Sequence, residues 1–358
     1  MVKKFLIIMS DRMGDMLMTT PVLRKLRKSY PGCRVDLLTS WRRKQIIEGN
    51  KYIDRVYIYQ KFSDALLEKR WITALKAFWI RQNYTACLVF SASEEQHRLA
   101  FEAGGKKCLK TGFAFSNTPW LDKTVLPDRS VHDIVNKLSL LREALGLKIS
   151  ARDYDMDFVI ARGAAIRIKK YLKSQGISSG GKYFVIHPGC SSDFPFRRWS
   201  TKGYIEIAQF LRKQGFKVFV TGQGEEWVYA NQIMLGGQPG AQLFVDRPIH
   251  ELAALIKGAR GLLCADTGIL HLSRALKTPV VSLFGPTTSV ETGCVGQGIY
   301  KMIQAKGDCP ACFAVVKGEF TFKRVCTNLY PPAPCMASIT PGQVKEAIQQ
   351  ILVARGSA

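Results

Sequence analysis

Apolar residues in this chain alternate between strand and helix spacing, and this alternation constrains the fold more than any other feature. In the first half, a buried strand is predicted at residues 4–10, and apolar residues recur at helical spacing over residues 16–29. Strands that alternate with helices form a parallel, doubly wound sheet. Further strands are predicted at residues 34–39, 55–59 and 86–90, and further helices at residues 42–48, 64–81 and 94–103.

The same alternation begins again after a polar, glycine-rich segment at residues 174–181, the best linker candidate in the chain. We therefore predict two Rossmann-like α/β domains, residues 1–175 and 176–358, that face a central cleft at the carboxyl ends of their strands. The final helix, residues 341–354, could pack on either domain. The second domain is predicted to contain strands at residues 183–187, 217–221, 242–245, 261–265 and 280–284, and helices at residues 202–214, 225–235, 249–258 and 269–277.

No apolar stretch of the sequence approaches the roughly 20 residues that are needed to span a bilayer. The apolar opening of the chain is cut short by Ser10-Asp11-Arg12, so it is predicted to be a first strand and not a signal peptide. We therefore expect a cytoplasmic protein.

Basic residues outnumber acidic ones and give the chain a formal net charge of +24. The excess is uneven, because residues 1–178 carry 33 Lys and Arg against 17 Asp and Glu, whereas the remainder carries 19 against 11. Basic clusters at residues 24–28, 42–44 and 167–170 make the first half a plausible partner for an acidic surface, such as nucleic acid, anionic lipid or acidic glycan. The alternative is that these clusters are solvated helix faces.

Four of the ten cysteines, Cys309, Cys312, Cys326 and Cys335, fall within one proline-containing segment. Four thiolates could converge on a zinc ion, but the spacing between the pairs is irregular, and a reduced structural loop is the alternative. We expect no metal ion in the functional site. The other six cysteines are scattered and form no disulfide framework.

Two common nucleotide-binding motifs are missing from the sequence. Residues 222–227 begin like the dinucleotide fingerprint, but Trp227 occupies the third glycine position and leaves no room for close packing of the helix on the strand. No G-x-x-x-x-G-K-[ST] sequence occurs. The sequence therefore argues against a hydride-transferring enzyme and against a P-loop NTPase.

Four predicted strands of the second domain end in polar or glycine residues suited to a ligand, at residues 187–189, 221–226, 266–268 and 285–288. One such turn would be ordinary helix capping. Because the carboxyl ends of parallel strands meet at one edge of a sheet, four such turns favour a ligand site.

This edge is predicted to bind a nucleotide diphosphate. Backbone N–H groups of the 267–268 turn would hold the diphosphate at the positive end of a helix dipole, and Arg197 or Arg198 would neutralise it. A carboxylate at residues 225–226 could accept both hydroxyls of a ribose. His271, one helical turn further on, either contacts the phosphate or packs internally. The residues expected to bind this nucleotide are Arg197, Glu225, Glu226, Asp266, Thr267, Gly268 and His271.

In the first half, the first strand is followed by a glycine and an aspartate at the start of the next helix. Gly14 would let the chain turn sharply and hold Asp15 at the helix N-terminus, facing the cleft, where the helix dipole favours an ionised carboxylate. Asp15 could act there as a general base for an acceptor hydroxyl, which an inverting transfer of an activated sugar needs. The alternative is a plain N-cap.

These features together resemble glycosyltransferase family 9, the lipopolysaccharide heptosyltransferases, over nearly the whole chain. Residues 9–23 resemble the family's GD-x-x-x-x-x-P-x-L start. Residues 266–271, followed by residues 283–287, resemble its D-[ST]-G-x-x-H … L-F-G-P-T signature. The family's K-x-W-P is replaced by R-R-W-S at residues 197–200, so an Arg stands for the phosphate-binding Lys and the Pro is absent.

The resemblance implies a GT-B fold and an inverting transfer from ADP-L-glycero-D-manno-heptose, with Asp15 as the base and no cofactor besides the donor. The implied acceptor is a Kdo or heptose residue of the lipopolysaccharide core on lipid A, at the cytoplasmic face of the inner membrane. The basic first half agrees with that acceptor and with peripheral contact to the anionic membrane, and the resemblance implies no nucleic-acid partner. The residues expected to contact the acceptor are Arg12, Gly14, Arg42 and Arg43.

Two rival functions stay open at this point. The first keeps the GT-B fold but uses another ADP- or UDP-sugar. The second is a non-catalytic basic module that binds membrane or nucleic acid through the first half of the chain, and the four polar strand ends argue against it.

Overall fold

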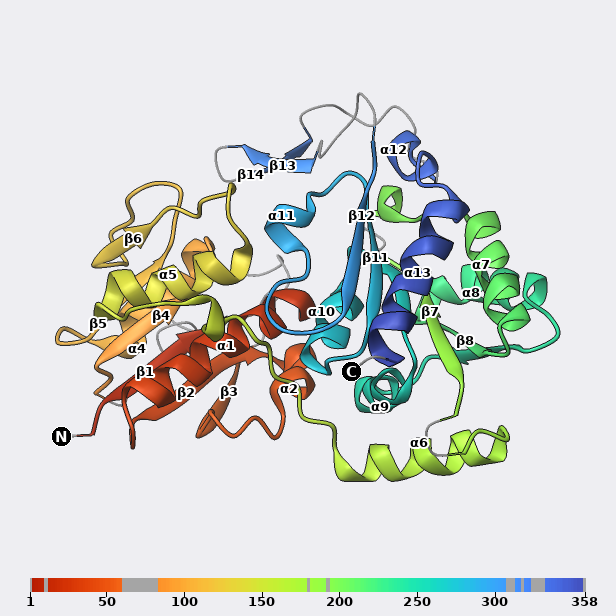
Figure 1. Ribbon diagram of the computed structural model, residues 1–358. Coiled ribbons are helices and arrows are strands. Elements are labelled where there is room, and N and C mark those ends of the chain that lie inside the picture. Colours follow the sequence, from red (N-terminus) through yellow and green to blue (C-terminus); the bar gives the residue numbers. More distant parts are fainter. Residues whose placement is uncertain are drawn as a thin grey trace, which may run out of the picture. The chain divides into compact units, whose positions relative to one another are not determined.

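The computed structural model describes residues 2–9, 12–59, 83–178, 181–190, 194–306, 313–316, 319–322 and 332–356. The chain folds into two compact units, Met1–Val159 and Ile160–Ala358. Each unit contains one parallel six-stranded sheet with helices packed around it (Figure 1). The predicted pair of doubly wound α/β sheets is confirmed.

The sheet of the first unit has the strand order β3-β2-β1-β4-β5-β6, and every pairing in it is parallel. The order reverses between β1 (Lys4–Ile8) and β4 (Ala86–Val89), which is the point where sheets of this type bind ligands. The remaining elements are β2 (Arg34–Ser40), β3 (Arg55–Tyr59), β5 (Leu109–Phe113), β6 (Lys123–Val125), α1 (Met13–Ser29), α2 (Trp41–Ile47), α4 (Glu94–Gly104), α5 (Asp133–Leu145) and the 3-10 turn η1 (Ala151–Asp153).

Strand β1 lies in the middle of this sheet because its side chains are apolar on both faces. Phe5, Leu6 and Ile7 are fully buried, and α1 adds Leu17 and Val22 to the core. Strands β5 and β6 and helix α5 were not predicted. In β5 the run Lys110-Thr111-Gly112 breaks the apolar pattern of a buried strand. The predicted helix at residues 64–81 lies outside the described residues.

The sheet of the second unit has the strand order β12-β11-β10-β7-β8-β9, again with parallel pairings throughout. Its order reverses between β7 (Tyr183–His187) and β10 (Leu262–Ala265). The other strands are β8 (Lys217–Gly222), β9 (Ala241–Val245), β11 (Val280–Phe284) and β12 (Tyr300–Gln304), with a separate hairpin of β13 (Phe313–Val316) and β14 (Glu319–Phe322). The helices are α6 (Arg162–Ser174), α7 (Thr201–Lys213), α8 (Trp227–Gly236), α9 (Ile249–Gly258), α10 (Gly268–Ala275), α11 (Ser289–Thr292), α12 (Pro334–Ala337) and α13 (Pro341–Gly356), with 3-10 turns η2 (Pro195–Arg197) and η3 (Gly224–Glu226).

The boundary between the two units lies earlier in the sequence than predicted. The division falls between residues 159 and 160 and not between 175 and 176, because α6 packs on α9 of the second unit. Arg167 Nε on α6 lies 2.5 Å from Glu251 Oε1 on α9. The final helix, α13, packs on α7, β11 and β12, so it belongs to the second unit.

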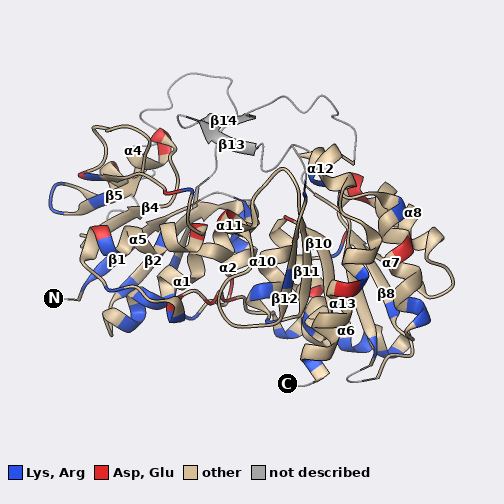
Figure 2. Cartoon of the chain, turned by 45° about the horizontal axis from the view of Figure 1, so that its top comes forward, with Lys and Arg blue, Asp and Glu red and all other residues tan. Residues whose placement is uncertain are grey.

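The basic cluster at residues 24–28 is largely used inside the first unit. Three of its cations form ion pairs with carboxylates that lie far away in the sequence: Arg24 with Asp157, Lys25 with Asp153, and Arg27 with Asp54. The prediction that this cluster is offered to an acidic partner is wrong for these three side chains. Lys169 and Lys170, by contrast, are exposed on α6, along which Figure 2 shows basic residues.

Helix α1, with 17 residues, is the longest one in the described part of the chain. None of the helices among those residues has the length and apolar composition required to cross a membrane.

Candidate functional site

The turn between β10 and α10 is the one that the sequence predicts to bind the diphosphate. Strand β10 ends at Ala265, and α10 begins at Gly268. Thr267 has an extended backbone, with φ −142° and ψ 169°, and its side chain does not cap α10. The Leu270 N–H donates to the carbonyl oxygen of Thr267 at 3.0 Å, so the N–H groups of Gly268 and Ile269 are those of the first helical turn that are available to a ligand at the positive end of the helix dipole.

Two buried hydroxyl groups lie at this edge of the second sheet. Thr267 follows β10 and Thr287 follows β11, and neither Oγ1 atom has a hydrogen-bond partner among the residues that the structure describes. A buried hydroxyl without a partner costs about 1–3 kcal/mol. Such groups indicate positions where a ligand supplies the missing partner.

Arg197 brings a cation to the same turn. Its Nη1 donates to the carbonyl oxygen of Asp266 at 3.3 Å and lies 3.5 Å from Asp266 Oδ2. Thr292 Oγ1 donates to Asp266 Oδ1 at 3.3 Å. Asp266 is only 4% exposed, so its carboxylate orients Arg197 and Thr292 around the turn, and its negative charge is balanced by the guanidinium.

A second group of polar residues lies at the ends of β7 and β8, beside the point where the strand order reverses. His187 Nδ1 lies 3.0 Å from Thr221 Oγ1. Burial lowers the pKa of His187, and the nearby Glu226 carboxylate raises it. Glu226 Oε2 accepts from the backbone N–H of Gln223 at 2.9 Å. A Cβ at Gly189 would lie 2.2 Å from the Glu226 carboxylate, so the glycine leaves the space that this carboxylate occupies.

The two predicted ribose ligands differ in their surroundings. Glu226 is partly buried against Gly189, whereas Glu225 is exposed on η3. Trp227 begins α8 and is 45% exposed, at the position where a dinucleotide fingerprint requires a glycine. His271 is buried on α10, one helical turn after the helix begins.

In the first unit, α1 begins at Met13, earlier than the predicted start at residue 16. Gly14 is buried within the first turn of α1, so the prediction that it forms a sharp turn before the helix is wrong. Asp15 is the third residue of the helix, and its Oδ2 accepts from the backbone N–H of Arg12 at 3.3 Å. Asp15 thus closes the first turn of α1 at the carboxyl end of β1.

The surroundings of Asp15 make its carboxylate more basic than usual. Burial raises the pKa of Asp15, the Lys137 ammonium lowers it, and the Asp133 carboxylate raises it. The backbone N–H and the guanidinium of Arg12 lower it further. A partly buried carboxylate with raised proton affinity is suited to act as a general base.

The predicted acceptor-binding residues follow the ends of β1 and β2. Arg12 is exposed and precedes α1, and Arg43 is partly buried on α2, which packs on α1. The backbone of Arg42 lies in the first turn of α2, and its side chain lies outside the described part.

Sequence reasoning missed Lys137, Asp133 and Thr292. The spacing of Asp133 and Lys137 indicates an ion pair on one helix face, but it does not say that the pair acts on Asp15. Thr292 carries no recognisable signal, because its role depends on where the loop after β11 places it.

The cysteine cluster is described only in part. Cys309, Cys312 and Cys326 lie outside the described residues, and Cys335 is buried on α12. Within the described ranges, no group of three or more His, Cys, Asp or Glu side chains is arranged to hold a metal ion.

Comparison with known proteins identifies the family. Residues 74–318 match the model of glycosyltransferase family 9 (heptosyltransferase). Lipopolysaccharide heptosyltransferase 3 of Escherichia coli is 26% identical to this chain, over 77% of the chain and 81% of the relative.

Two solved structures have a similar fold. A family 9 glycosyl transferase from Veillonella parvula has a TM-score of 0.82 at 17% identity, over 98% of each chain. The E. coli ADP-heptose lipopolysaccharide heptosyltransferase II has a TM-score of 0.75 at 18% identity, over 99% of each chain. The predicted GT-B fold is confirmed. Since the family match covers more than half of the chain, this protein belongs to glycosyltransferase family 9, the heptosyltransferase family, and is a glycosyltransferase and not a non-catalytic basic module.

Proposed function

We propose that this chain transfers heptose from ADP-L-glycero-D-manno-heptose to a Kdo or heptose residue of the lipopolysaccharide inner core, with inversion at the anomeric carbon. The observation that carries the proposal is the edge of the second sheet, where Arg197 and the hydroxyls of Thr267 and Thr287 surround the start of α10. The names of an E. coli relative and of a solved neighbour, both lipopolysaccharide heptosyltransferases, support this choice of substrates.

The donor is bound by its diphosphate and its ribose. The backbone N–H groups of Thr267 and Gly268 and the Arg197 guanidinium bind the diphosphate oxygens, and the two threonine hydroxyls donate to the same group. Glu226 accepts the ribose hydroxyls beside Gly189. Asp266 holds Arg197 in place through the 3.5 Å ion pair.

Transfer proceeds by a single displacement. The Asp15 carboxylate removes the proton from the acceptor hydroxyl, and the acceptor oxygen forms a bond to the anomeric carbon on the face opposite the diphosphate. The bond from that carbon to the β-phosphate oxygen breaks, and its electron pair leaves with ADP. Arg197 and the backbone N–H groups stabilise the charge that develops on the departing phosphate. No cofactor besides the donor takes part.

The acceptor side is basic. Arg12, Arg42 and Arg43 would bind the anionic core sugars, and the lipid anchor of the acceptor would bring the protein to the cytoplasmic face of the inner membrane. Exposed Lys169 and Lys170 on α6 offer the second unit a contact of its own with anionic lipid. Sedimentation with phosphatidylglycerol vesicles tests this contact, because electrostatic binding should weaken steeply as salt concentration rises.

Nucleotide preference is the first test of the proposed function. Thermal-shift measurements with ADP, UDP, GDP and CDP should show the largest stabilisation with ADP. Purified protein, ADP-heptose and a Kdo-terminated acceptor should then yield a heptosylated product whose new linkage has the anomeric configuration opposite to that of the donor, as measured by NMR. Transfer from another ADP- or UDP-sugar at a higher rate, or retention of configuration, would overturn the proposal.

A further inference from the structure

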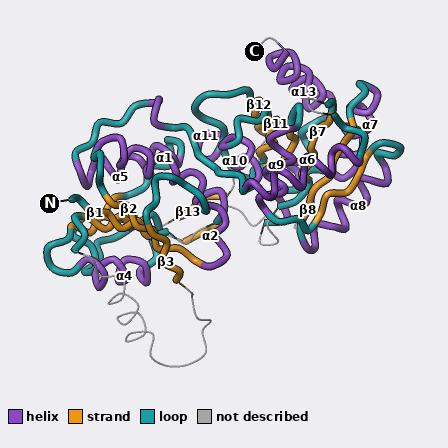
Figure 3. The backbone as a smooth tube through the Cα atoms, turned by 90° about the horizontal axis from the view of Figure 1, so that it is seen from below, coloured by secondary structure: helices purple, strands orange, loops and turns teal. Residues whose placement is uncertain are grey.

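Helix α5 of the first unit carries an ion pair whose lysine is buried. Lys137 is only 3% exposed, and its Nζ lies 3.0 Å from Asp133 Oδ2, one helical turn away on α5. Lysine is rarely buried to this extent, because its charge must be compensated. Helix α5 packs on α1, the helix that begins with Asp15, and the two helices lie side by side in Figures 1 and 3.

The start of α5 is held firmly in place. The Nδ1 of His132, the N-cap of the helix, accepts from the backbone N–H of Ile134 at 3.1 Å. The side chain of Asn136 accepts from the N–H of Asp128 at 2.9 Å and donates to its carbonyl oxygen at 2.7 Å. These contacts fix the helical turn that carries Asp133 and Lys137.

The charges that act on Asp15 come from two elements. From the start of α1, Arg12 acts through its N–H and its guanidinium, and from α5, Lys137 and Asp133 act with opposite signs. Helix α2 also packs on α1 and carries Arg43 and Lys44, which are not among the main charges that act on Asp15. Lys137 is the strongest of the groups that favour the ionised carboxylate, and it opposes the effect of burial.

We propose that Lys137 is a positioning residue for transfer: its ammonium, held by Asp133, keeps the Asp15 carboxylate ionised and ready to accept the proton of the acceptor hydroxyl. The inference rests on the proposed function of Asp15 as the base. It accounts for a charged side chain at this buried place, since a neutral side chain would leave Asp15 without its main opposing cation.

The test is the pH profile of Lys137→Met. Without the ammonium, the pKa of Asp15 rises, so the acid limb of kcat should move to higher pH. Below the pKa of Asp15 in both proteins the loss should be about tenfold for each unit of displacement, and it should shrink as pH rises. The donor KM should not change. Lys137→Arg should restore the wild-type profile, and Lys137→Gln provides a second neutral variant, with circular dichroism as the check on folding.

Lys123→Met is the matched control. Lys123 Nζ lies 2.8 Å from Glu143 Oε2 at the far end of α5, where both side chains are exposed, so its removal should leave the pH profile unchanged. An equal loss at every pH in Lys137→Met and Lys137→Gln, with an unmoved acid limb, would overturn the inference and leave Lys137 a structural residue.

A direct titration separates this inference from the proposed function. The carboxyl carbon of Asp15, assigned by its absence in Asp15→Asn, is titrated by 13C NMR in wild type and in Lys137→Met. A higher midpoint in the variant supports the inference, and an unchanged midpoint overturns it. If Asp15→Asn retained turnover, the proposed base would fail while the titration would still report the coupling to Lys137.

Discussion

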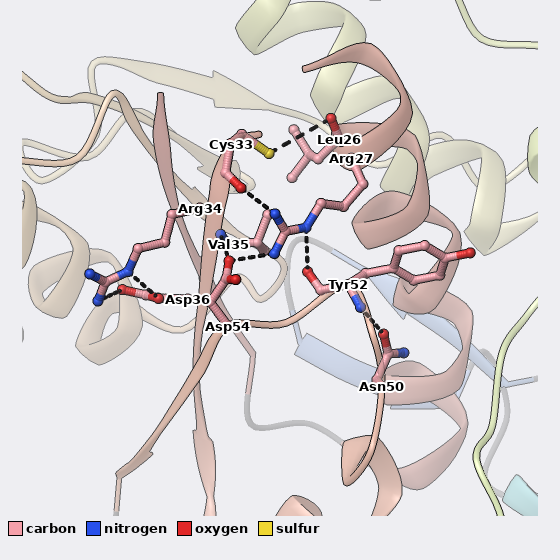
Figure 4. Close-up of polar contacts among 9 residues, drawn as sticks. All are labelled: Leu26, Arg27, Cys33, Arg34, Val35, Asp36, Asn50, Tyr52 and Asp54. Atoms are coloured by element: carbon pink, nitrogen blue, oxygen red, sulfur yellow. Dashed lines mark hydrogen bonds and ion pairs between the residues drawn. The ribbon is translucent and has the colours of Figure 1, made fainter. Parts of the chain in front are cut away.

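Charged side chains at the two edges of the first sheet differ in how fully they are paired. At the amino edge, where the strands begin, Arg34 donates to both oxygens of Asp36 at 2.9 and 2.8 Å, and Arg27 pairs with Asp54 (Figure 4). At the carboxyl edge, burial penalises the charge of Asp15, and its main opposing cation is also held by Asp133.

The amino edge connects elements of the unit. Asp54 Oδ2 accepts from the backbone N–H of Val35 at 2.7 Å, and Arg27 Nε donates to the carbonyl oxygen of Tyr52 at 3.2 Å (Figure 4). These contacts join α1 to β2 and to the loop before β3. Charges that are fully paired stabilise the fold, whereas a charge held in an unfavourable setting is typical of a functional site. Substitutions at the amino edge should therefore reduce stability, and those at the carboxyl edges should reduce ligand binding or turnover.

The largest effect is expected for Asp15→Asn. Loss of the base should lower kcat by about 10³-fold, within the range for general bases, while ADP affinity stays unchanged. The folded-state pKa of Asp15 is raised, so ionisation of this group costs stability above that pKa. Asn removes this cost, and the melting temperature at pH 7 should not fall. Radiolabelled heptose transfer and calorimetry measure the two quantities.

Asp54→Asn is the matched control from the amino edge. It should lower the melting temperature at pH 7 and leave kcat unchanged at temperatures where the variant is folded. Full turnover in Asp15→Asn, or loss of turnover without loss of stability in Asp54→Asn, would break the distinction between the two edges.

The second largest effect is expected for Asp36→Asn, on stability alone. Asp36 is fully buried and also accepts from Tyr84 Oη at 2.8 Å, so the substitution leaves Arg34 without its charged partner. Breaking a buried pair costs about 3 kcal/mol, which urea unfolding can measure. Glu143→Gln is the comparison, because that carboxylate pairs with Lys123 at a place where both side chains are exposed, so its loss should cost much less. A changed kcat in folded Asp36→Asn would argue against a purely structural role.

Thr267→Val and Thr287→Val should each weaken ADP binding by about tenfold, the value of one lost hydrogen bond. Neither substitution should reduce stability, because neither hydroxyl has a partner among the described residues. The control is Thr278→Val, whose Oγ1 donates to the carbonyl oxygen of Ile256 at 3.1 Å, and which should lose stability but not ADP affinity. Calorimetric titration distinguishes these outcomes, and unchanged affinity in both edge variants would remove the hydroxyls from the donor site.

The smallest effect is expected for Asp153→Asn. This substitution should lower stability at pH 7, whereas Asp15→Asn should not. Burial raises the pKa of Asp153, but Lys25 and the Ser150 N–H lower it more, so the net pKa is lowered. A lowered pKa stabilises the fold above the unfolded value and loses this effect as pH falls through the folded value. Asn keeps an oxygen that can accept from the Ser150 N–H and loses only the charge that pairs with Lys25, so the substitution should cost about 1 kcal/mol at pH 7. The free energy of unfolding should be lower in the variant than in the wild type at pH 7 and equal in the two proteins below pH ~3.

Much of the fold could be predicted because its signals are local. Strand β1 and helix α1 are recognisable from apolar spacing within a few residues of each position. Strand β5 was missed because Lys110-Thr111-Gly112 does not look like a buried strand, although all three residues are buried in the folded unit. The Gly14-Asp15 pair was recognised, but Gly14 lies inside the helix and makes no sharp turn before it.

The two parallel sheets, a helix that begins near Gly268 and the aspartate at the start of α1 could be predicted from the sequence, because strand period, helix period and helix-end chemistry depend only on neighbouring residues. Tertiary contacts determine which charged side chains find partners inside the fold. Arg24 finds Asp157 across 133 residues, and Lys137 acts on Asp15 because α5 packs on α1. The physical reason is that the compensation of a buried charge, or of a buried hydroxyl such as that of Thr267, depends on what packs beside it, and the packing partners come from distant parts of the chain.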